Sequence, residues 1–139
     1  MTNIDYVQNY FKSVNKLNAD LEKKATDAIK EFGKEINIVA IKAHDLNLDS
    51  VDDEDEVLES VYNDCEFGNV ETKHDNICEC AILGVRYVKE TDKIEALMYD
   101  YLWSDVNEWV DIVNLCRNTQ ISVYVTILEY IDQAKEINS

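Results

Sequence analysis

The sequence has no proline and only three glycines, Gly33, Gly68 and Gly84, in 139 residues. Phosphate-binding loops such as GxGxxG and the P-loop need several glycines close together, so their absence argues against the nucleotide-binding enzymes that use them. The chain also has no Gly-, Ser- or Pro-rich linker and no internal repeat. We therefore predict a single acidic domain over residues 1–139, a size that one hydrophobic core can stabilise.

Long apolar runs are missing as well. No stretch approaches the roughly 18 apolar residues that a membrane span needs, and the first residues lack the basic and apolar regions of a secretory signal. We expect a cytoplasmic protein with no membrane partner. In a reducing compartment, the four cysteines are expected to be thiols or metal ligands rather than disulfides: Cys65, Cys78, Cys80 and Cys116.

Local signatures of catalysis are also lacking. No motif marks a cysteine or histidine as a nucleophile, and carboxylates are too numerous for one acid–base pair to stand out. We expect a protein that is not an enzyme and that uses no cofactor.

The clearest pattern that is present lies at the N-terminus. Apolar residues recur at steps of three and four, with Asn18 filling the one missing position, and this spacing predicts an amphipathic helix of about 29 residues, or about 43 Å. Thr2 or Asn3 can cap its start and Gly33 can end it. The apolar positions are Ile4, Val7, Phe11, Val14, Leu21, Ala25, Ala28 and Phe32.

This helix has two interpretations. An Asn at an a-type position within a 3-4 spacing is typical of a coiled-coil seam, which would make the protein a homodimer through the N-terminal helix. However, Tyr10, Leu17 and Ile29 widen the apolar stripe. Because a broad stripe is typical of a helix that packs on its own domain, we favour that interpretation and keep the homodimer as the alternative.

The rest of the chain predicts an α+β fold. Two apolar runs joined by a short polar connection at 90–93 indicate an antiparallel hairpin, whose second strand we expect to be covered on both faces. The complete prediction is a long N-terminal amphipathic helix, a small mainly antiparallel sheet with a central hairpin, and C-terminal helices packed on the sheet. Its first elements are a strand at 36–43 and a short helix that starts after its cap, Ser50, and includes 56–62. Hairpin strands at 76–88 and 93–103, a helix capped by Ser104 and a last helix capped by Thr119 follow.

Charge is distributed very unevenly along the chain. Residues 43–72 contain eleven Asp and Glu and no Lys or Arg, whereas residues 1–42 have a net charge of +1 and residues 73–139 of −6. Like charges this close repel one another and destabilise a compact arrangement unless something offsets them. The acidic segment therefore requires an explanation, and three are considered.

The simplest explanation is a solvated helix start. Ser50 can cap a helix whose first turn favours Asp52 and Asp53, because the N-terminal end of a helix is partly positive. This accounts for those two residues, but not for thirty consecutive positions without a basic side chain.

The second explanation is calcium. Read as a twelve-residue loop, residues 45–56 have the oxygen-ligand spacing of an EF-hand. The match is degenerate because position 6 is Ser50 instead of glycine, position 8 is Asp52, the preceding segment is predicted to be a strand, and no second loop exists to pair with it. The ligand positions are Asp45, Asn47, Asp49, the Val51 carbonyl, Asp53 and Glu56.

Zinc is a further metal to consider. Four residues of the right chemical type for a structural zinc site fall close together: Cys65, His74, Cys78 and Cys80. The C-x-C spacing departs from the usual C-x2-C, so buried thiols in a strand are the favoured interpretation and we assign no metal ligand.

The third explanation is a surface for a basic partner. Carboxylates can take the places of nucleic-acid phosphates, and their summed field attracts a basic protein while it repels DNA and RNA. We therefore expect an inhibitor that binds a nuclease or other defence effector, of the DNA-mimic, anti-CRISPR or immunity type. The predicted partner-binding residues are Asp45, Asp49, Asp52, Asp53, Glu54, Asp55, Glu56 and Glu59. The aromatic cluster Tyr99, Tyr101, Trp103 and Trp109 has two interpretations, a recognition patch with an acidic rim or core packing, and we favour core packing for at least half of these rings.

Overall fold

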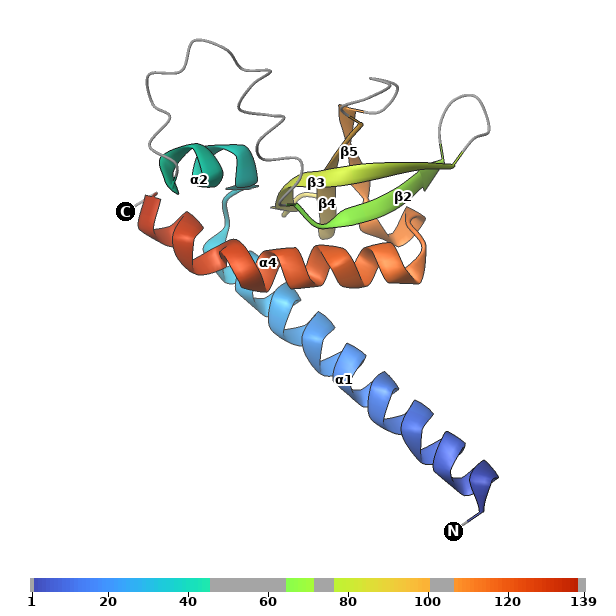
Figure 1. Ribbon diagram of the computed structural model, residues 1–139. Coiled ribbons are helices and arrows are strands. Elements are labelled where there is room, and N and C mark those ends of the chain that lie inside the picture. Colours follow the sequence, from blue (N-terminus) through green and yellow to red (C-terminus); the bar gives the residue numbers. More distant parts are fainter. Residues whose placement is uncertain (1, 46–64, 72–76, 101–106, 138–139) are drawn as a thin grey trace.

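Figure 1 shows the computed structural model, which describes residues 2–45, 65–71, 77–100 and 107–137. Within these ranges all strand pairs are antiparallel, and the helices lie outside the sheet, which confirms the predicted α+β class. The elements are helices α1 (Asn3–Phe32), α2 (Ile38–Asp45) and α4 (Arg117–Ile137), the short 3-10 helix η1 (Ile112–Asn114), and strands β1 (Ile36–Asn37), β2 (Phe67–Glu71), β3 (Ile77–Val88), β4 (Lys93–Tyr99) and β5 (Asn107–Asp111).

The long N-terminal helix begins and ends where the sequence predicts. The Thr2 hydroxyl accepts a hydrogen bond from the Asp5 amide at 3.1 Å, and the Asp5 carboxylate accepts one from the Thr2 amide at 3.3 Å, which forms a capping box. At the other end Gly33 takes a positive φ of 68° and its amide donates to the Ile29 carbonyl at 3.1 Å. Glycine adopts this conformation without a steric penalty, so the helix stops there.

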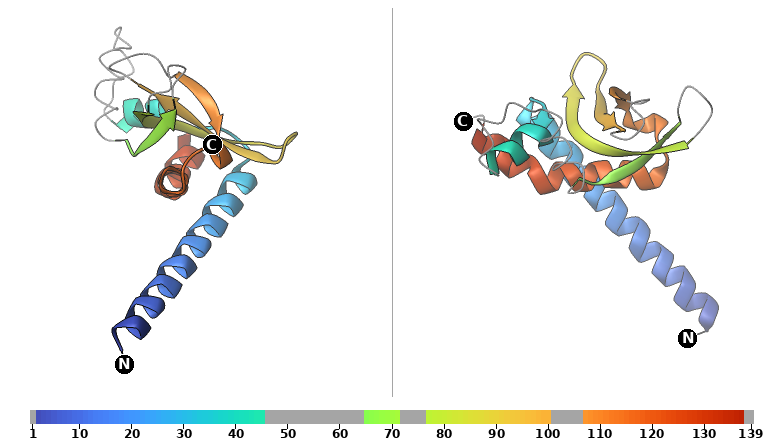
Figure 2. Two further views of the ribbon diagram at one scale, coloured as in Figure 1. Left: turned by 90° about the vertical axis from the view of Figure 1, so that its right-hand side faces the viewer. Right: turned by 45° about the horizontal axis from the view of Figure 1, so that its top comes forward.

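Only the C-terminal half of α1 packs on the rest of the protein. Ala25 and Ile29 are fully buried, and this half lies against α4. The N-terminal half leaves the body and ends far from it, as both Figure 1 and Figure 2 show. The expectation that the whole stripe packs on its own domain is therefore wrong for Ile4, Val7 and Phe11, which are exposed.

β3 is the central strand of the sheet. It has 12 residues and pairs with β1, β2 and β4, while β5 pairs with β4 at one edge. The predicted hairpin is confirmed as β3 and β4, in which Val88 lies opposite Lys93. Asp92, in the turn between them, has a φ of 53°, and aspartate is one of the residues that visits this left-handed region.

The sheet packs through one face on α4, which runs along it in Figures 1 and 2. Along β4, Ile94, Ala96 and Met98 are buried, whereas Leu97 and Tyr99 between them are half-buried. Alternate residues of a strand point to opposite faces, so one face lies in the core and the other is only partly covered. The expectation of two covered faces is thus confirmed for the face that lies in the core and is wrong for the other, which is only partly covered.

Three element predictions are wrong at identifiable positions. The strand expected at 36–43 ends after Asn37, whose side chain accepts a hydrogen bond from the Ala40 amide at 3.0 Å and so starts α2. The helix expected after Ser104 is instead β5, with Trp109 opposite Leu97. The last helix begins at Arg117, before the predicted cap at Thr119. The helix predicted at 56–62 and Ser104 itself lie outside the described residues.

Candidate functional site

One of the eight predicted partner-binding residues, Asp45, lies within the described part of the chain. It is exposed at the end of α2, and its Oδ2 accepts a hydrogen bond from Nε2 of Gln133 on α4 at 3.0 Å. The structure therefore places the start of the acidic segment where α2 meets α4. The other seven residues lie outside the described residues: Asp49, Asp52, Asp53, Glu54, Asp55, Glu56 and Glu59.

The helix that carries Asp45 is fixed to the core. Ile38 and Ile41, three residues apart on α2, are 0% and 2% exposed. One residue further along, the Lys42 ammonium lies 5.3 Å from the centroid of the Tyr130 ring on α4, a cation–π contact. Apolar burial and this contact together hold α2 against α4, and Asp45 with it.

The chain returns from the acidic segment at Cys65, which is buried. Burial raises the pKa of the Tyr130 hydroxyl; Lys42 opposes this shift, while the Glu129 carboxylate and Cys65 add to it. Cys65 therefore lies near Tyr130, three residues before the Gln133 that binds Asp45. The residues on either side of 46–64 thus lie near the same turn of α4.

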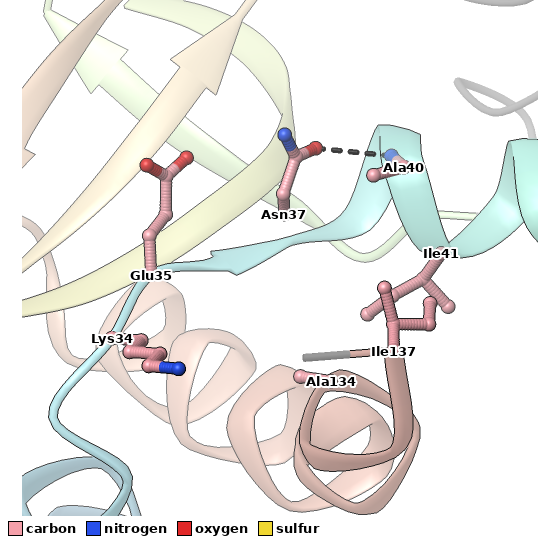
Figure 3. Close-up of a pocket in the computed structure, with 7 residues that line it drawn as sticks. All are labelled: Lys34, Glu35, Asn37, Ala40, Ile41, Ala134 and Ile137. Atoms are coloured by element: carbon pink, nitrogen blue, oxygen red, sulfur yellow. Dashed lines mark hydrogen bonds between the residues drawn. The ribbon is translucent and has the colours of Figure 1, made fainter. Parts of the chain in front are cut away.

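A cavity of about 300 Å³ lies beside this junction, between the start of α2 and the end of α4. Figure 3 shows Ile41 facing Ala134 and Ile137 across it, with the charged ends of Lys34 and Glu35 at its other side. Its volume is at the lower limit of ligand pockets, and its lining combines apolar side chains with one cation and one carboxylate. Lys34 and Glu35 are both exposed, and the lining contains no Ser, Thr, Cys or His, so the cavity gives no reason to assign a reaction. Its lining residues are Lys34, Glu35, Asn37, Ala40, Ile41, Ala134 and Ile137.

Among the described residues, no three His, Cys, Asp or Glu side chains lie close enough together to hold a metal ion. Of the four residues considered for zinc, Cys65 and Cys80 are buried and not in disulfides, His74 lies outside the described residues, and the side chain of Cys78 is likewise not described.

One of the objections to the calcium loop is wrong. The segment that precedes Asp45 was expected to be a strand, but it is α2, so the chain enters residues 45–56 from a helix as it does in an EF-hand. Against this, the Asp45 carboxylate, at the first ligand position, is bound to Gln133.

Half of the predicted aromatic cluster can be placed. Tyr99 and Trp109 are half-buried on the same face of the sheet, since Trp109 lies opposite Leu97 and Tyr99 follows Leu97 by two residues. The Arg86 guanidinium lies 4.2 Å from the centroid of the Trp109 ring and pairs with the Glu95 carboxylate at 2.7 Å. The surface here is therefore of mixed charge. Tyr101 and Trp103 lie outside the described residues.

Cys116 has an environment that sequence reasoning missed. It is exposed directly before α4, and its Sγ lies 3.0 Å from the Thr119 hydroxyl. Hydrogen bonds from this hydroxyl and from backbone amides lower the pKa of the Cys116 thiol. A cysteine at the start of a helix is the sequence pattern that predicts a lowered thiol pKa. Because the start of this helix was predicted at Thr119, Cys116 was not recognised as such a cysteine.

In the part of the chain that the structure describes, no helix is both long enough and apolar enough to cross a bilayer. Comparison of the chain with protein-family models, with curated proteins and with solved structures found no match. The function is therefore argued from the residues themselves.

Proposed function

We propose that this protein is a non-enzymatic, cytoplasmic inhibitor that occupies a basic nucleic-acid-binding surface of another protein. The observation that supports the proposal is the concentration of eleven carboxylates, without one Lys or Arg, in residues 43–72. The proposed partner is a nuclease or another defence effector, and the proposed type is a DNA mimic, an anti-CRISPR or other anti-defence protein, or an immunity protein.

In the proposed mechanism, carboxylates of this protein take the places of nucleic-acid phosphates on the partner. A nucleic-acid-binding surface places Lys and Arg where phosphates lie, and carboxylates at similar spacing can satisfy the same side chains. The field of the acidic segment also raises the rate of encounter with a basic protein, and the total charge of −16 disfavours direct binding of DNA or RNA.

Anchoring of the segment favours this role. Asp45, before 46–64, is hydrogen-bonded to Gln133 of α4, and Cys65, after it, is buried in the core near the same turn of α4. A binding segment whose ends are fixed loses less conformational entropy on association than a free one. More of the electrostatic attraction is then available for affinity.

The test compares two variants that lose the same amount of charge. In the first, the five consecutive acids 52–56 are changed to their amides. In the second, the matched control, five exposed acids elsewhere are changed: Glu31, Glu90, Glu108, Glu129 and Asp132. The tagged wild type is expected to capture a nucleic-acid-binding protein from a lysate at low salt, the first variant to lose it, and the control to keep it. Equal capture by all three would contradict the proposal.

Salt provides a second measurement on the captured complex. Exposed charges are screened beyond about 8 Å at physiological ionic strength, so association should slow steeply as salt rises. An affinity that stays constant up to about 0.5 M salt would exclude a charge-based interface.

The second candidate is a calcium-binding protein with the degenerate EF-hand-like loop at 45–56. The observation that favours it is that α2 leads directly into Asp45. Calcium would then offset the repulsion among the carboxylates and raise the melting temperature. A melting temperature that is the same in calcium, in zinc and in EDTA would remove metal binding from consideration.

A homodimer through the N-terminal helix, the alternative interpretation of its apolar stripe, is a separate interaction. It would use apolar side chains of α1 rather than carboxylates, so changes to the acidic segment should leave it intact.

A further inference from the structure

The N-terminal half of α1 carries most of the exposed large apolar side chains of the described residues. Six of them there are 47–69% exposed, although apolar groups of this size are normally buried. They continue the stripe that the C-terminal half of α1 packs against α4 (Figure 1). On this stripe are Ile4 (69%), Val7 (47%), Tyr10 (57%), Phe11 (57%) and Leu17 (67%), with Val14 partly exposed between them.

The order of these residues is symmetric about a point between Tyr10 and Phe11. Counting outward in both directions, Tyr10 matches Phe11, then Val7 matches Val14, and Ile4 matches Leu17. The next stripe positions, Asn3 and Asn18, are both asparagine. In each matched pair, the two residue numbers add up to 21. In two antiparallel helices related by a two-fold axis at this point, residue i of one copy lies level with residue 21 − i of the other. Each of these three pairs then joins two apolar residues, and both ends of the seam are polar. Tyr6, at the edge of the stripe beside Leu17, is the exception, because it lies level with Asn15.

The small charge of residues 2–19 indicates that the molecule that covers the apolar stripe is a second copy of this protein. Residues 2–19 contain only Asp5, Lys12 and Lys16, a net charge of +1 in a protein of −16. At 3.6 residues per turn these three lie on the side of the helix away from the stripe, so no charged side chain meets its own copy across the seam. A basic protein, which the acidic remainder would attract, finds no carboxylate on the stripe.

The charge of the rest of the protein sets the orientation. A parallel pair would bring the two acidic bodies side by side, where they repel each other. An antiparallel pair puts them at opposite ends of a seam of 14 residues, 4–17, about 21 Å long, which exceeds the screening length of about 8 Å at physiological salt.

The area is sufficient for a reversible dimer. With large apolar side chains of about 150–250 Å² each and roughly half or more of each exposed, the pair buries on the order of 1,000 Å². That is near the lower limit of specific interfaces, so the dimer should dissociate on dilution.

We infer that two copies of this protein pair through the N-terminal halves of their α1 helices, antiparallel, with Tyr10 and Phe11 at the two-fold axis. The two acidic bodies then lie at opposite ends of the assembly. This inference rests on the apolar stripe and is independent of what the acidic segment binds.

Sedimentation velocity over a range of protein concentrations tests the dimer. The wild type should pass from monomer to dimer, and the change should occur at lower concentration in about 0.15 M salt than in about 0.01 M salt, because the screening length of about 30 Å at low salt lets the two bodies repel each other. Phe11→Glu puts two carboxylates at the axis and should weaken the dimer at least tenfold. A wild type that stays monomeric at all concentrations, or a Phe11→Glu variant that dimerises like the wild type, would overturn the inference.

The matched control is on a different element. Leu17 on α1 and Val113 on η1 are 67% and 70% exposed. Leu17→Glu should weaken the dimer, whereas Val113→Glu adds the same charge at the same exposure and should not. Equal weakening by both would show that charge alone, and not the α1 seam, controls association.

Cross-linking tests the orientation. In a Cys116→Ser background, which removes the exposed native thiol, a mixture of Ile4→Cys and Leu17→Cys proteins should form a mixed disulfide on oxidation. Cross-linking of Ile4→Cys to itself would instead indicate a parallel pair and overturn the antiparallel arrangement. The background protein alone is the control for other thiols.

The proposed dimer and the proposed binding of a basic partner can be tested independently of each other. Phe11→Glu should leave capture of a basic partner intact, and amides at 52–56 should leave the dimer intact. The complex with a basic partner weakens with salt, whereas the dimer strengthens.

Discussion

Thr119, in the first turn of α4, lies directly against Gly68 of β2. The Thr119 hydroxyl accepts a hydrogen bond from the amide of Asn69, the next residue, at 3.0 Å. A β carbon at position 68 would lie only 2.2 Å from Cγ2 of Thr119, which is 2% exposed and has no room to move away. This contact sets how closely the sheet approaches the helix.

Gly68→Ala is therefore expected to destabilise the protein by about 1–3 kcal/mol, the usual cost of overpacking a core. The measurement is the free energy of unfolding in urea. Thr119→Ser removes Cγ2 but keeps the hydroxyl, so Gly68→Ala should cost less in that background. If the cost is the same in both backgrounds, the contact with Cγ2 does not cause it.

Tyr124 on α4 is expected to contribute more to stability than the ion pair beside it. Its hydroxyl, on a side chain only 4% exposed, donates to Oε1 of Glu22 on α1 at 3.2 Å. Tyr124→Phe should lower the free energy of unfolding by about 0.5–1.5 kcal/mol. Arg117 binds the same carboxylate at 3.3 Å, but both side chains are nearly half exposed, so Arg117→Gln should cost less. The reverse order of the two costs would contradict this.

The turn between β3 and β4 should respond to pH in two ranges. The Tyr87 hydroxyl donates to the Asp92 carboxylate, which raises the pKa of Tyr87 and lowers that of Asp92. The raised pKa means that the Tyr87 contribution to stability is present below its ordinary value of 10.0 and is lost as pH rises through the folded value. The lowered pKa means that the Asp92 contribution is present above 3.8 and is lost as pH falls.

Asp92→Asn tests this coupling. Asparagine tolerates the positive φ at this position and can still accept the hydrogen bond, but it carries no charge. The pKa of Tyr87, followed by NMR of the tyrosine ring carbon, should fall toward its ordinary value. Tyr124, whose pKa is raised first by burial, is the internal control and should not change.

Cys116 should be alkylated faster than the other placed thiols. Its pKa is lowered and it is exposed, whereas Cys65 and Cys80 are buried. Because the thiolate is the reactive form, its reaction with iodoacetamide should persist to lower pH than that of an unfolded cysteine peptide. Mass spectrometry locates the modified residue, and Cys116→Ser should abolish the fast phase. Equal rates for Cys116 and the peptide at every pH would refute the shift.

Local signals predicted the parts of the fold that depend on neighbouring residues. The capping box at Thr2 and Asp5, the glycine that ends α1, and the short turn of the β3–β4 hairpin are all encoded within a few positions. These elements were therefore predictable without knowledge of the rest of the chain.

The elements that were missed depend on distant partners. Ile38, Val39 and Ile41 suit a strand or a helix equally, and their burial against α4 decides for the helix. β2 contains Gly68 and Asn69, which are poor strand formers, and it exists because β3 extends far enough to pair with it. The acidic segment was found by counting charges, whereas the environment of Cys116 needed the true start of α4.

The pairing of α1 with α4 also has a consequence during synthesis on the ribosome. More than eighty residues separate Phe32 from Arg117, so α1 is complete roughly 4–17 seconds before the helix that buries its C-terminal half begins to be made. Throughout that interval the stripe lacks α4, its main partner, although β3 is made within it. On a polysome, the same helix on a neighbouring nascent chain is therefore open to this stripe before α4 exists.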